Sequence, residues 1–529
     1  MKVKPNKQTR KKKTIKPKKQ SNKIKKKSIK RRSRSKSKSK GKSKAKKQQI
    51  PQNYTKIGKL ENGMKYYIDR DKSYNNVSLM FKVKCGGITE GKYEGLSHLL
   101  EHVLFNGTKK YSNRELLSKE LNKHGTDFNG STSYEDTSYY MTFPSSKVHK
   151  IIPILSELIR FSNIDSYLIE KEKNVLDNEY NYRKDMNSYL ERLNKLNLYK
   201  NSIYKNQYSG NKISLKDIEK HHLHAYLNTF YQPNNCMIGI LGDFNISQKE
   251  LLNMIKENFG NSNFLDYYKF ENTNKKYKDY LKEELYFKKI LKTIDMKRKE
   301  PIKYNWGFHT HKMNHLNQAY VFITFKCDAS LVKSRLIQNQ HKLDNLINNY
   351  LSYPRSGKLH NILRNQEKLI YNLSVKNKRN LSHNGIFVIK YNITPEPHLI
   401  NKSINLILEI LNKLKTDLLT EKEIKELQNY KKMYSKTFKD DTIDELDMMI
   451  SELIFANINS PYYKDRVKDF EELDKAKDIK KKKQNVKELY TPKNIKKRSI
   501  ELFDKNKISI NCYTPQTVKL LIDNFKNIL

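Results

Sequence analysis

The chain has 529 residues, which is too long for one ordinary hydrophobic core and predicts two or three domains. It carries 106 Lys and Arg against 56 Asp and Glu, and contains no run of 18 apolar residues, which excludes a membrane-spanning helix. The four cysteines lack the C-x-x-C spacing of a thiolate zinc site or a redox motif and are typical of reduced thiols in an intracellular protein.

Residues 1–50 hold 25 of the basic residues and no acid. This segment has almost no apolar side chains, so it cannot offset the entropy lost on ordering, and we expect a disordered tail. It lacks the apolar stretch of a secretory signal. Its Lys/Arg density is typical of a nuclear-import signal or of a segment that binds nucleic acid or another polyanion, while a solvated tail without a specific partner explains the composition equally well.

Alternation of apolar and polar residues over 56–90 predicts two or three strands, followed by a helix that contains two histidines. Residues 112–125 predict a helix with Ser112 as its N-cap and Gly125 just beyond its end. The other elements expected in this half are strands over 126–144 and 236–244 and helices over 145–160, 166–192 and 247–260.

A charged stretch over 265–300 shows little apolar periodicity, and we assign it to a linker. The order of elements then repeats, with strands over 319–327, 385–393 and 508–513, helices over 331–350, 396–415 and 421–437, and a last helix at the end of the chain. This repetition predicts an α+β fold with two homologous domains, each a mostly antiparallel mixed sheet with packed helices, facing each other across a cleft. The expected boundaries are 1–50 for the tail, 51–264 for the first domain, 265–300 for the linker and 301–529 for the second domain.

The segment GLSHLLEHVLFNGTKKY, residues 95–111, contains His-x-x-Glu-His. His98 and His102 are one helical turn apart, so both imidazoles project from one face and could offer two nitrogens to a zinc ion. Glu101 adjoins the second histidine and could act as a base toward a metal-bound water. The alternative is a pair of histidines that is solvated or satisfied in the core, and a third protein ligand would decide between the two.

The helix expected over 166–185 is rich in acids and could supply that ligand. Glu172 and Glu179 are seven residues apart and share one helical face, so one could bind the metal while the other hydrogen-bonds a ligand histidine. Spacing alone does not choose among Glu170, Glu172, Asp177 and Glu179. A charged surface helix is the alternative reading, and it fits Glu170 and Asp177 well.

Taken together, these residues resemble the insulinase/pitrilysin family of zinc metallopeptidases, which have an inverted His-x-x-Glu-His motif and a glutamate ligand about 76 residues further on. Here, 76 residues separate His102 from Glu179. The resemblance implies that Zn²⁺ binds to His98, His102 and Glu179, that Glu101 is the catalytic base, and that Glu172 supports a ligand histidine. It also implies that Asn129 and Gly130, in GTDFNGSTSYEDTSYY, bind substrate at an edge strand, although Ser131 replaces the aromatic residue that many members carry.

In the second half, GKLHNILRNQEKLIY resembles the family's Leu-Arg-(six residues)-Tyr element. The resemblance implies that Arg364 and Tyr371 reach the scissile carbonyl. The length is similar to that of two-domain members with one site, such as the mitochondrial processing peptidase, which implies a homo- or hetero-dimer if a closed chamber is needed.

The sequence therefore predicts a zinc-dependent endopeptidase acting on extended peptides or unfolded segments. Two other functions are kept as alternatives: a catalytically silent scaffold or partner subunit of the same fold, and a polyanion-binding protein that acts through residues 1–50. The tail also favours an intracellular location, nuclear or associated with nucleic acid, over secretion by a classical signal.

Overall fold

The structure is a computed structural model that divides the chain into two units, 1–49 and 50–529. The expected tail, 1–50, lies outside the described residues. The structure describes residues 53–182, 185–199, 202–204, 208–297, 303–327, 335–353, 357–378, 385–437, 442–456, 488–519, 525 and 527–528.

The first sheet has six strands in the order β1-β2-β6-β3-β5-β4. The pair β2/β6 is parallel and every other neighbouring pair is antiparallel. The prediction of strands over 56–90, 126–144 and 236–244 is confirmed. The strands are β1 (Tyr54–Lys59), β2 (Lys65–Arg70), β3 (Asn76–Val83), β4 (Asp127–Thr132), β5 (Thr137–Pro144) and β6 (Cys236–Gly242).

The second sheet has five strands in the order β7-β11-β8-β10-β9. Here β7/β11 is the parallel pair and the others are antiparallel. The strands are β7 (Gly307–Lys312), β8 (Ala319–Cys327), β9 (Ile370–Lys378), β10 (Gly385–Ile393) and β11 (Ile508–Thr514). Both the order and the directions of these five strands repeat those of β2-β6-β3-β5-β4. The prediction of two repeated, mostly antiparallel mixed sheets is therefore confirmed.

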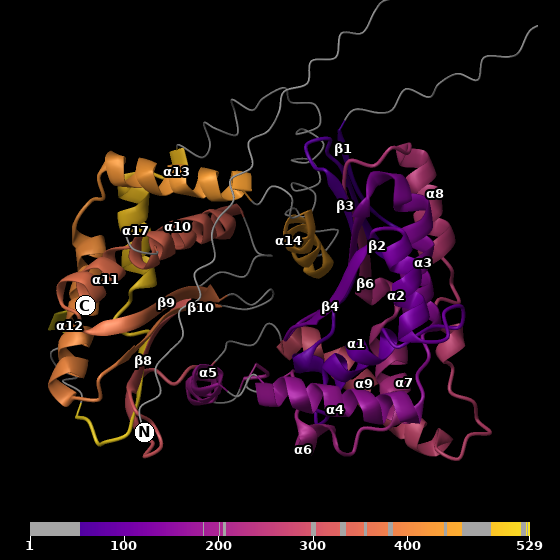
Figure 1. The fold of residues 1–529 in the computed structure, drawn as a ribbon, viewed down its shortest axis with the longest axis horizontal. Helices are drawn as coiled ribbons and strands as arrows, with labels where there is room; N and C mark the ends of the chain where they lie inside the picture. The colour runs from indigo at the N-terminus through magenta and orange to yellow at the C-terminus, as the bar shows by residue number, and fades with distance from the viewer. Residues whose placement is uncertain are drawn as a thin grey trace, which may run out of the picture. The chain divides into compact units, whose positions relative to one another are not determined.

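Helices fill the connections of both halves (Figure 1). The first half contains α1 (Leu96–Leu104), α2 (Arg114–Lys123), α3 (Val148–Phe161), α4 (Ser166–Tyr182), α5 (Met186–Leu198), α6 (Lys212–Leu215), α7 (Lys220–Phe230), α8 (Gln248–Phe259) and α9 (Tyr277–Lys297), with short 3₁₀ turns at Gly87–Thr89, Ser145–Lys147, Pro233–Asn235 and Asp266–Tyr268. The second half contains α10 (Arg335–Ser352), α11 (Lys358–His360), a π-helical turn (Asn361–Gln366), α12 (Pro397–Thr416), α13 (Glu421–Thr437), α14 (Thr442–Phe455) and α17 (Pro492–Leu502).

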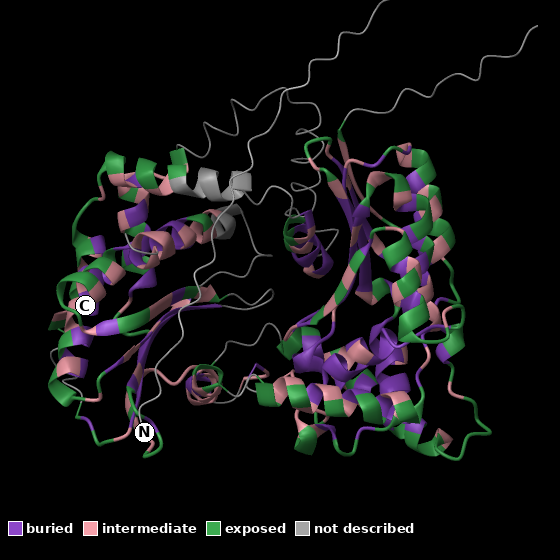
Figure 2. Ribbon diagram, in the orientation of Figure 1, coloured by how far each residue is buried: buried purple, intermediate pink, exposed green. Residues whose placement is uncertain are grey.

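Each sheet has a hydrophobic core on one of its faces. In the first half, α1, α3, α7 and α8 pack on one face, and side chains such as Leu79 and Phe81 of β3 alternate with residues that point to the other face. In the second half, α10, α12 and α17 cover the corresponding face of β8 and β10. Figure 2 shows these inward surfaces as buried and the outward surfaces of α3 and α8 as mostly exposed.

The opposite face of each sheet is covered by a helix from the other half. α14 packs its Leu446, Ile450 and Leu453 against Met80 of β3 and Met237 of β6. Conversely, α5 shares a buried cluster with the second sheet: Leu190, Leu198, Phe322, Ile386, Val388 and Tyr513. The two halves therefore exchange helices.

Lysines from the first sheet anchor α14. The ammonium of Lys82, buried on β3, lies 2.7 Å from Asp447 Oδ1 and 2.6 Å from Ser451 Oγ, and also pairs with Asp136. Lys65 Nζ donates to the carbonyls of Leu453, Ile454 and Ala456 at the C-terminus of α14. A cation at this end of a helix satisfies carbonyls that have no partner within the helix and complements the helix dipole.

The structure differs from two sequence predictions, and a third falls mostly outside the described residues. The N-cap of α2 is Asn113, whose side chain accepts from the Leu116 amide, and not Ser112. The range assigned to a linker contains α9, which buries Tyr280, Phe287 and Ile294. The last helix falls on residues of which only 525, 527 and 528 are described.

None of the helices in the described part of the chain combines the length and apolar character needed to cross a membrane.

Candidate metal centre

α1 is buried along nearly its whole length, with Leu96, Leu99, Leu100 and Val103 in the core (Figure 2). The helix starts after Gly95, which has a φ of 91° and provides no side-chain cap. Instead, the buried carboxylate of Glu90 accepts from the amides of Gly95, at 2.8 Å, and Ser97, at 2.9 Å. Glu90 was not predicted from the sequence, although the lack of a capping residue before α1 indicated that the helix needs an acceptor from elsewhere.

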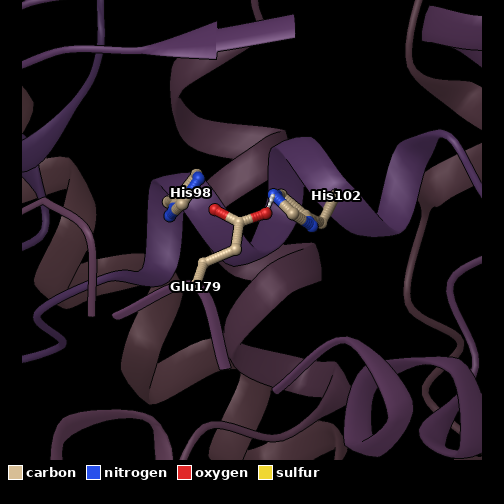
Figure 3. Close-up of side chains that lie close together, drawn as sticks. All are labelled: His98, His102 and Glu179. Carbon is tan, nitrogen blue, oxygen red and sulfur yellow. Dashed lines mark ion pairs between the residues drawn. The ribbon is translucent and has the colours of Figure 1, made fainter. Parts of the chain in front are cut away.

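The imidazoles of His98 and His102 and the carboxylate of Glu179 come together on one side of α1. One potential ligand atom from each lies within 4.8 Å of the other two. Figure 3 shows the Glu179 carboxylate, from α4, between the two rings, which are nearly perpendicular to each other at 86°. No other group of three such side chains occurs among the described residues.

Hydrogen bonds fix the orientation of both rings. His98 Nδ1 lies 3.1 Å from the carbonyl oxygen of Ser209, and His102 Nδ1 lies 3.1 Å from Glu172 Oε2. A carbonyl and a carboxylate are both acceptors, so in the neutral imidazoles the proton lies on Nδ1 and the lone pair on Nε2. This is the arrangement of ligand histidines in proteins, whose second ring nitrogen donates to such an acceptor.

The charges around His102 affect its protonation. Burial lowers the His102 pKa, but the Glu172 hydrogen bond and the charges of Glu101 and Glu179 outweigh it and raise the pKa above its usual value. Burial raises the Glu172 pKa, but hydrogen bonds with His102 and Asn106 outweigh it and lower the pKa. Three carboxylates around two imidazoles form an acidic environment suited to a divalent cation.

The donor set suits zinc. Two imidazole nitrogens and one carboxylate oxygen form one of the ligand sets of catalytic zinc sites, which keep a further position open. Of the four acids that spacing left open, Glu170 pairs with Lys173, and Asp177 accepts from the Lys212 amide and from Asn181. Glu172 and Glu179 are the two that turn toward the histidines.

Glu101 lies beside this cluster and is held from β4. Its Oε2 accepts from the Thr132 hydroxyl at 2.8 Å, a contact that the sequence analysis missed. Its Oε1 lies so close to Gly130 that a β-carbon at that position would be 2.4 Å away. Gly130 therefore leaves the space that the carboxylate occupies.

Asn129 and Gly130 lie on β4, the last strand of the first sheet. The Asn129 side chain accepts from the Gly130 amide at 2.9 Å. Because β4 pairs only with β5 in the described sheet, its other edge carries backbone groups that an extended peptide could pair with. Their role in substrate binding stays a prediction.

Arg364 and Tyr371 contact each other rather than the histidine cluster. The Arg364 guanidinium lies over the Tyr371 ring, 4.6 Å from its centre, and contacts His360. Tyr371 is 69% exposed, at the start of β9. Among their described contacts, none joins them to His98, His102 or Glu179, so their predicted role at the scissile carbonyl needs a bound substrate to test it.

A cavity of about 190 Å³ opens beside the cluster. Its lining includes His98, Glu179, Tyr134, Tyr208 and Arg192. Aromatic rings and charged groups thus line the space next to the histidines, where a peptide could bind.

Comparison with known proteins identifies the family. Residues 66–213 match the family described as Insulinase (Peptidase family M16), and residues 217–431 match the Peptidase M16 inactive domain. Among curated proteins, the chain is 28% identical to the mitochondrial-processing peptidase subunit beta of Dictyostelium discoideum over 211 residues, which are 39% of this chain and 44% of that protein. It is 27% identical to the probable zinc protease PqqL of Escherichia coli over 222 residues, which are 40% of this chain and 23% of that protein. The chain thus covers less than half the length of either relative.

Solved structures share the fold. A protease from Helicobacter pylori superposes with a TM-score of 0.65 at 16% identity, over 88% of this chain and 100% of that chain. A peptidase M16 inactive domain from Pseudomonas fluorescens superposes with a TM-score of 0.66 at 14% identity, over 88% of this chain and 99% of that chain.

Proposed function

Because the chain belongs to the peptidase M16, or insulinase, family, we propose that it is a zinc-dependent endopeptidase that cleaves extended peptides or unfolded segments. The convergence of His98, His102 and Glu179, with ligand atoms within 4.8 Å of one another, is the observation that carries the proposal. A scaffold without activity would not need these three side chains and Glu101 together.

In this proposal, Nε2 of each histidine and the carboxylate of Glu179 hold the zinc ion. Zinc supplies Lewis-acid chemistry, which polarises a peptide carbonyl and makes water acidic enough to lose a proton near neutral pH. The hydrogen bonds of Nδ1 to Glu172 and to the Ser209 carbonyl would orient the two rings to bind the ion through Nε2. The structure thus provides the support that ligand histidines need.

Glu101 moves the proton. Its carboxylate accepts a proton from the attacking water and delivers it to the amine that leaves. The Thr132 hydroxyl holds one oxygen, and Gly130 leaves room for the other. These two contacts would orient the carboxylate toward the attacking water, and correct orientation of a catalytic group contributes to the rate.

The substrate would add as a strand to the free edge of β4, beside Asn129 and Gly130. Pairing of this kind uses the peptide backbone, so it suits extended chains of varied sequence. Arg364 and Tyr371, in the second half, would approach the scissile carbonyl once substrate is bound. We place the zinc site in the first domain, 51–264, and these substrate contacts in the second, 301–529.

A partner chain is also part of the proposal, because one relative is named as a subunit of a processing peptidase. The partner would be a second copy of this chain or a related protein. Analytical ultracentrifugation of the purified chain, alone and mixed with such a protein, separates these cases.

The test is the Glu101→Gln variant. The substitution keeps the size and the Thr132 hydrogen-bond partner but removes the base, so peptide cleavage should be lost while zinc stays bound. Zinc content is measured by metal analysis and cleavage with a mixture of unfolded peptides, with and without a chelator. Cleavage retained by Glu101→Gln, or by chelated wild-type protein, would contradict the proposal.

A further inference from the structure

A second cavity adjoins the one beside the candidate metal centre. It has a volume of about 390 Å³ and shares Tyr134, Ser188, Arg192 and Tyr208 with the first. Its remaining walls come from α5, β9 and β10. A peptide held at His98 and Glu179 would therefore reach this cavity.

Positive charge dominates the second cavity. Five basic side chains line it against the single acid Glu191: Arg192, Lys195, Lys376, Lys378 and Lys390. Glu191 pairs with three of them, at 3.1 Å to Lys378, 3.1 Å to Lys390 and 3.9 Å to Lys376. One carboxylate cannot neutralise three ammonium groups, so the cavity keeps a net positive charge.

Lys195 lies in this cavity without a carboxylate partner among the described residues. Its ammonium lies 3.0 Å from the centre of the Tyr134 ring, and no carboxylate in the described part of the chain pairs with it. Burial, with the charge of Lys378, lowers the Lys195 pKa well below its usual value. The cavity therefore disfavours the charged form of Lys195, and a bound carboxylate would restore it by pairing with the ammonium.

The strand geometry directs the lysines into the same space. Lys376 and Lys378 are two residues apart on β9, so both project from one face of the sheet. Lys390 and the apolar Ile386 and Val388 project from the same face of β10. The floor of the cavity is therefore apolar, with ammonium groups above it, which suits a carboxylate on a short aliphatic stem.

We propose that this cavity binds a carboxylate of the peptide substrate, and that the enzyme therefore selects peptides that carry a carboxylate near the scissile bond. The inference rests on the proposed peptidase function and names its substrate class. The carboxylate has two sources, an acidic side chain or the C-terminus of the peptide.

Binding to the Glu101→Gln variant tests the inference without turnover. The probes are fluorescent peptides of one backbone sequence with Asp, Asn or Lys at several positions, each made with a free and with an amidated C-terminus. Fluorescence anisotropy measures Kd at low and at high salt. We expect the Asp peptide to bind about tenfold more tightly than the Asn peptide at low salt, with a smaller difference at high salt because ions screen the attraction.

A preference for Asp that survives amidation assigns the cavity to acidic side chains. A preference for the free C-terminus over the amide, whatever the side chains, assigns it to the terminal carboxylate. Either result supports binding of a carboxylate. Equal Kd values for the Asp, Asn and Lys peptides with both kinds of C-terminus would overturn the inference.

Charge reversal ties the preference to the cavity. In the Glu101→Gln background, the Lys376→Glu/Lys378→Glu double variant should lose the preference for Asp and bind the Lys peptide more tightly. The matched control is Lys249→Glu/Lys256→Glu, which makes the same charge change at exposed positions of α8. A preference that survives in the first variant would place its cause outside the cavity, and a preference lost equally in the control would assign it to the overall charge of the protein. Either result would overturn the inference.

Lys195→Gln removes the half-buried amino group without introducing an acid, and circular dichroism checks that the variant is folded. Its affinity for the Asp peptide should fall toward that for the Asn peptide.

The inference and the proposed function can fail separately. If zinc-loaded wild-type protein cleaves no peptide, the proposed function fails, while the anisotropy still reports whether the cavity takes a carboxylate.

Discussion

Glu172 Oε2 lies 3.1 Å from His102 Nδ1 and, with 1% exposure, is almost completely buried beneath the candidate metal centre. This contact has three effects. It fixes the ring of His102, sets the proton on Nδ1, and places a negative charge behind the ring. A carboxylate in this position increases the basicity of the opposite nitrogen.

The first prediction concerns this contact. Glu172→Ala should weaken zinc binding by about 10- to 100-fold, the range seen when such supporting groups are removed. Competition with a chromogenic chelator measures the affinity. The control is Glu170→Ala, on the same helix, where the glutamate is exposed and pairs only with Lys173 among its described contacts. Equal zinc affinity of the two variants would contradict the role assigned to Glu172.

The second prediction concerns the space for Glu101. Gly130→Ala would place a β-carbon 2.4 Å from Glu101 Oε1, so the carboxylate has to move. Because a misplaced catalytic group can lose about 100-fold in rate, we expect kcat to fall by that order while zinc content is unchanged. Gly125→Ala is the control, because a β-carbon there would come no closer than 3.6 Å to its nearest neighbour, Pro144 Cγ, so the positive φ of 64° can cost stability without displacing Glu101. A fall in zinc content that matches the fall in kcat would show damage to the metal site instead.

The third prediction concerns Lys82, which joins β3 to α14. Lys82→Met leaves the buried carboxylate of Asp136 without its ion pair and should destabilise the fold by about 3 kcal/mol. Thermal unfolding followed by circular dichroism measures the change. Lys72→Met, at an exposed position, should change stability by less than about 0.5 kcal/mol. The interpretation is wrong if the two variants unfold at the same temperature.

The fourth prediction concerns pH. Burial raises the Glu191 pKa, but Lys378 and Lys390 outweigh it and lower the pKa from 4.5 to about 2. A depressed carboxyl pKa contributes stability that is present above pH 4.5 and is lost as the pH falls toward 2. The stability difference between wild-type protein and Glu191→Gln should therefore be constant from pH 7 to about 5 and shrink below that. Urea unfolding at a series of pH values measures it, and a difference independent of pH would contradict the ion pairs.

The sequence predicted the strands well because their patterns are local. β8 and β10 begin and end at the residues expected, since each is a short apolar run between polar segments. α9 was not predicted, because the apolar stripe of this helix is weak. Its buried Tyr280, Phe287 and Ile294 are seven residues apart, and the fourth member of that face is the buried Glu283, so the apolar stripe has little contrast with the charged residues around it.

In the candidate site, too, residues close in sequence were predicted, and contacts between distant segments were not. The spacing of His98 and His102 placed both on one face of a helix, and the structure has them there. The Ser209 carbonyl and the Thr132 hydroxyl could not be found, because each comes from a segment whose position depends on tertiary packing. Resemblance to a family, rather than spacing, selected Glu179 among four acids, and its role as a ligand stays a prediction.

The exchange of α5 and α14 has a consequence for any attempt to divide the protein. A fragment that ended before α14 would leave Met80 and Met237 open to water, and a fragment that began after α5 would leave Phe322 and Val388 uncovered. Cleavage of the chain between α9 and β7 should accordingly yield two pieces that stay associated, because each piece covers an apolar sheet face of the other.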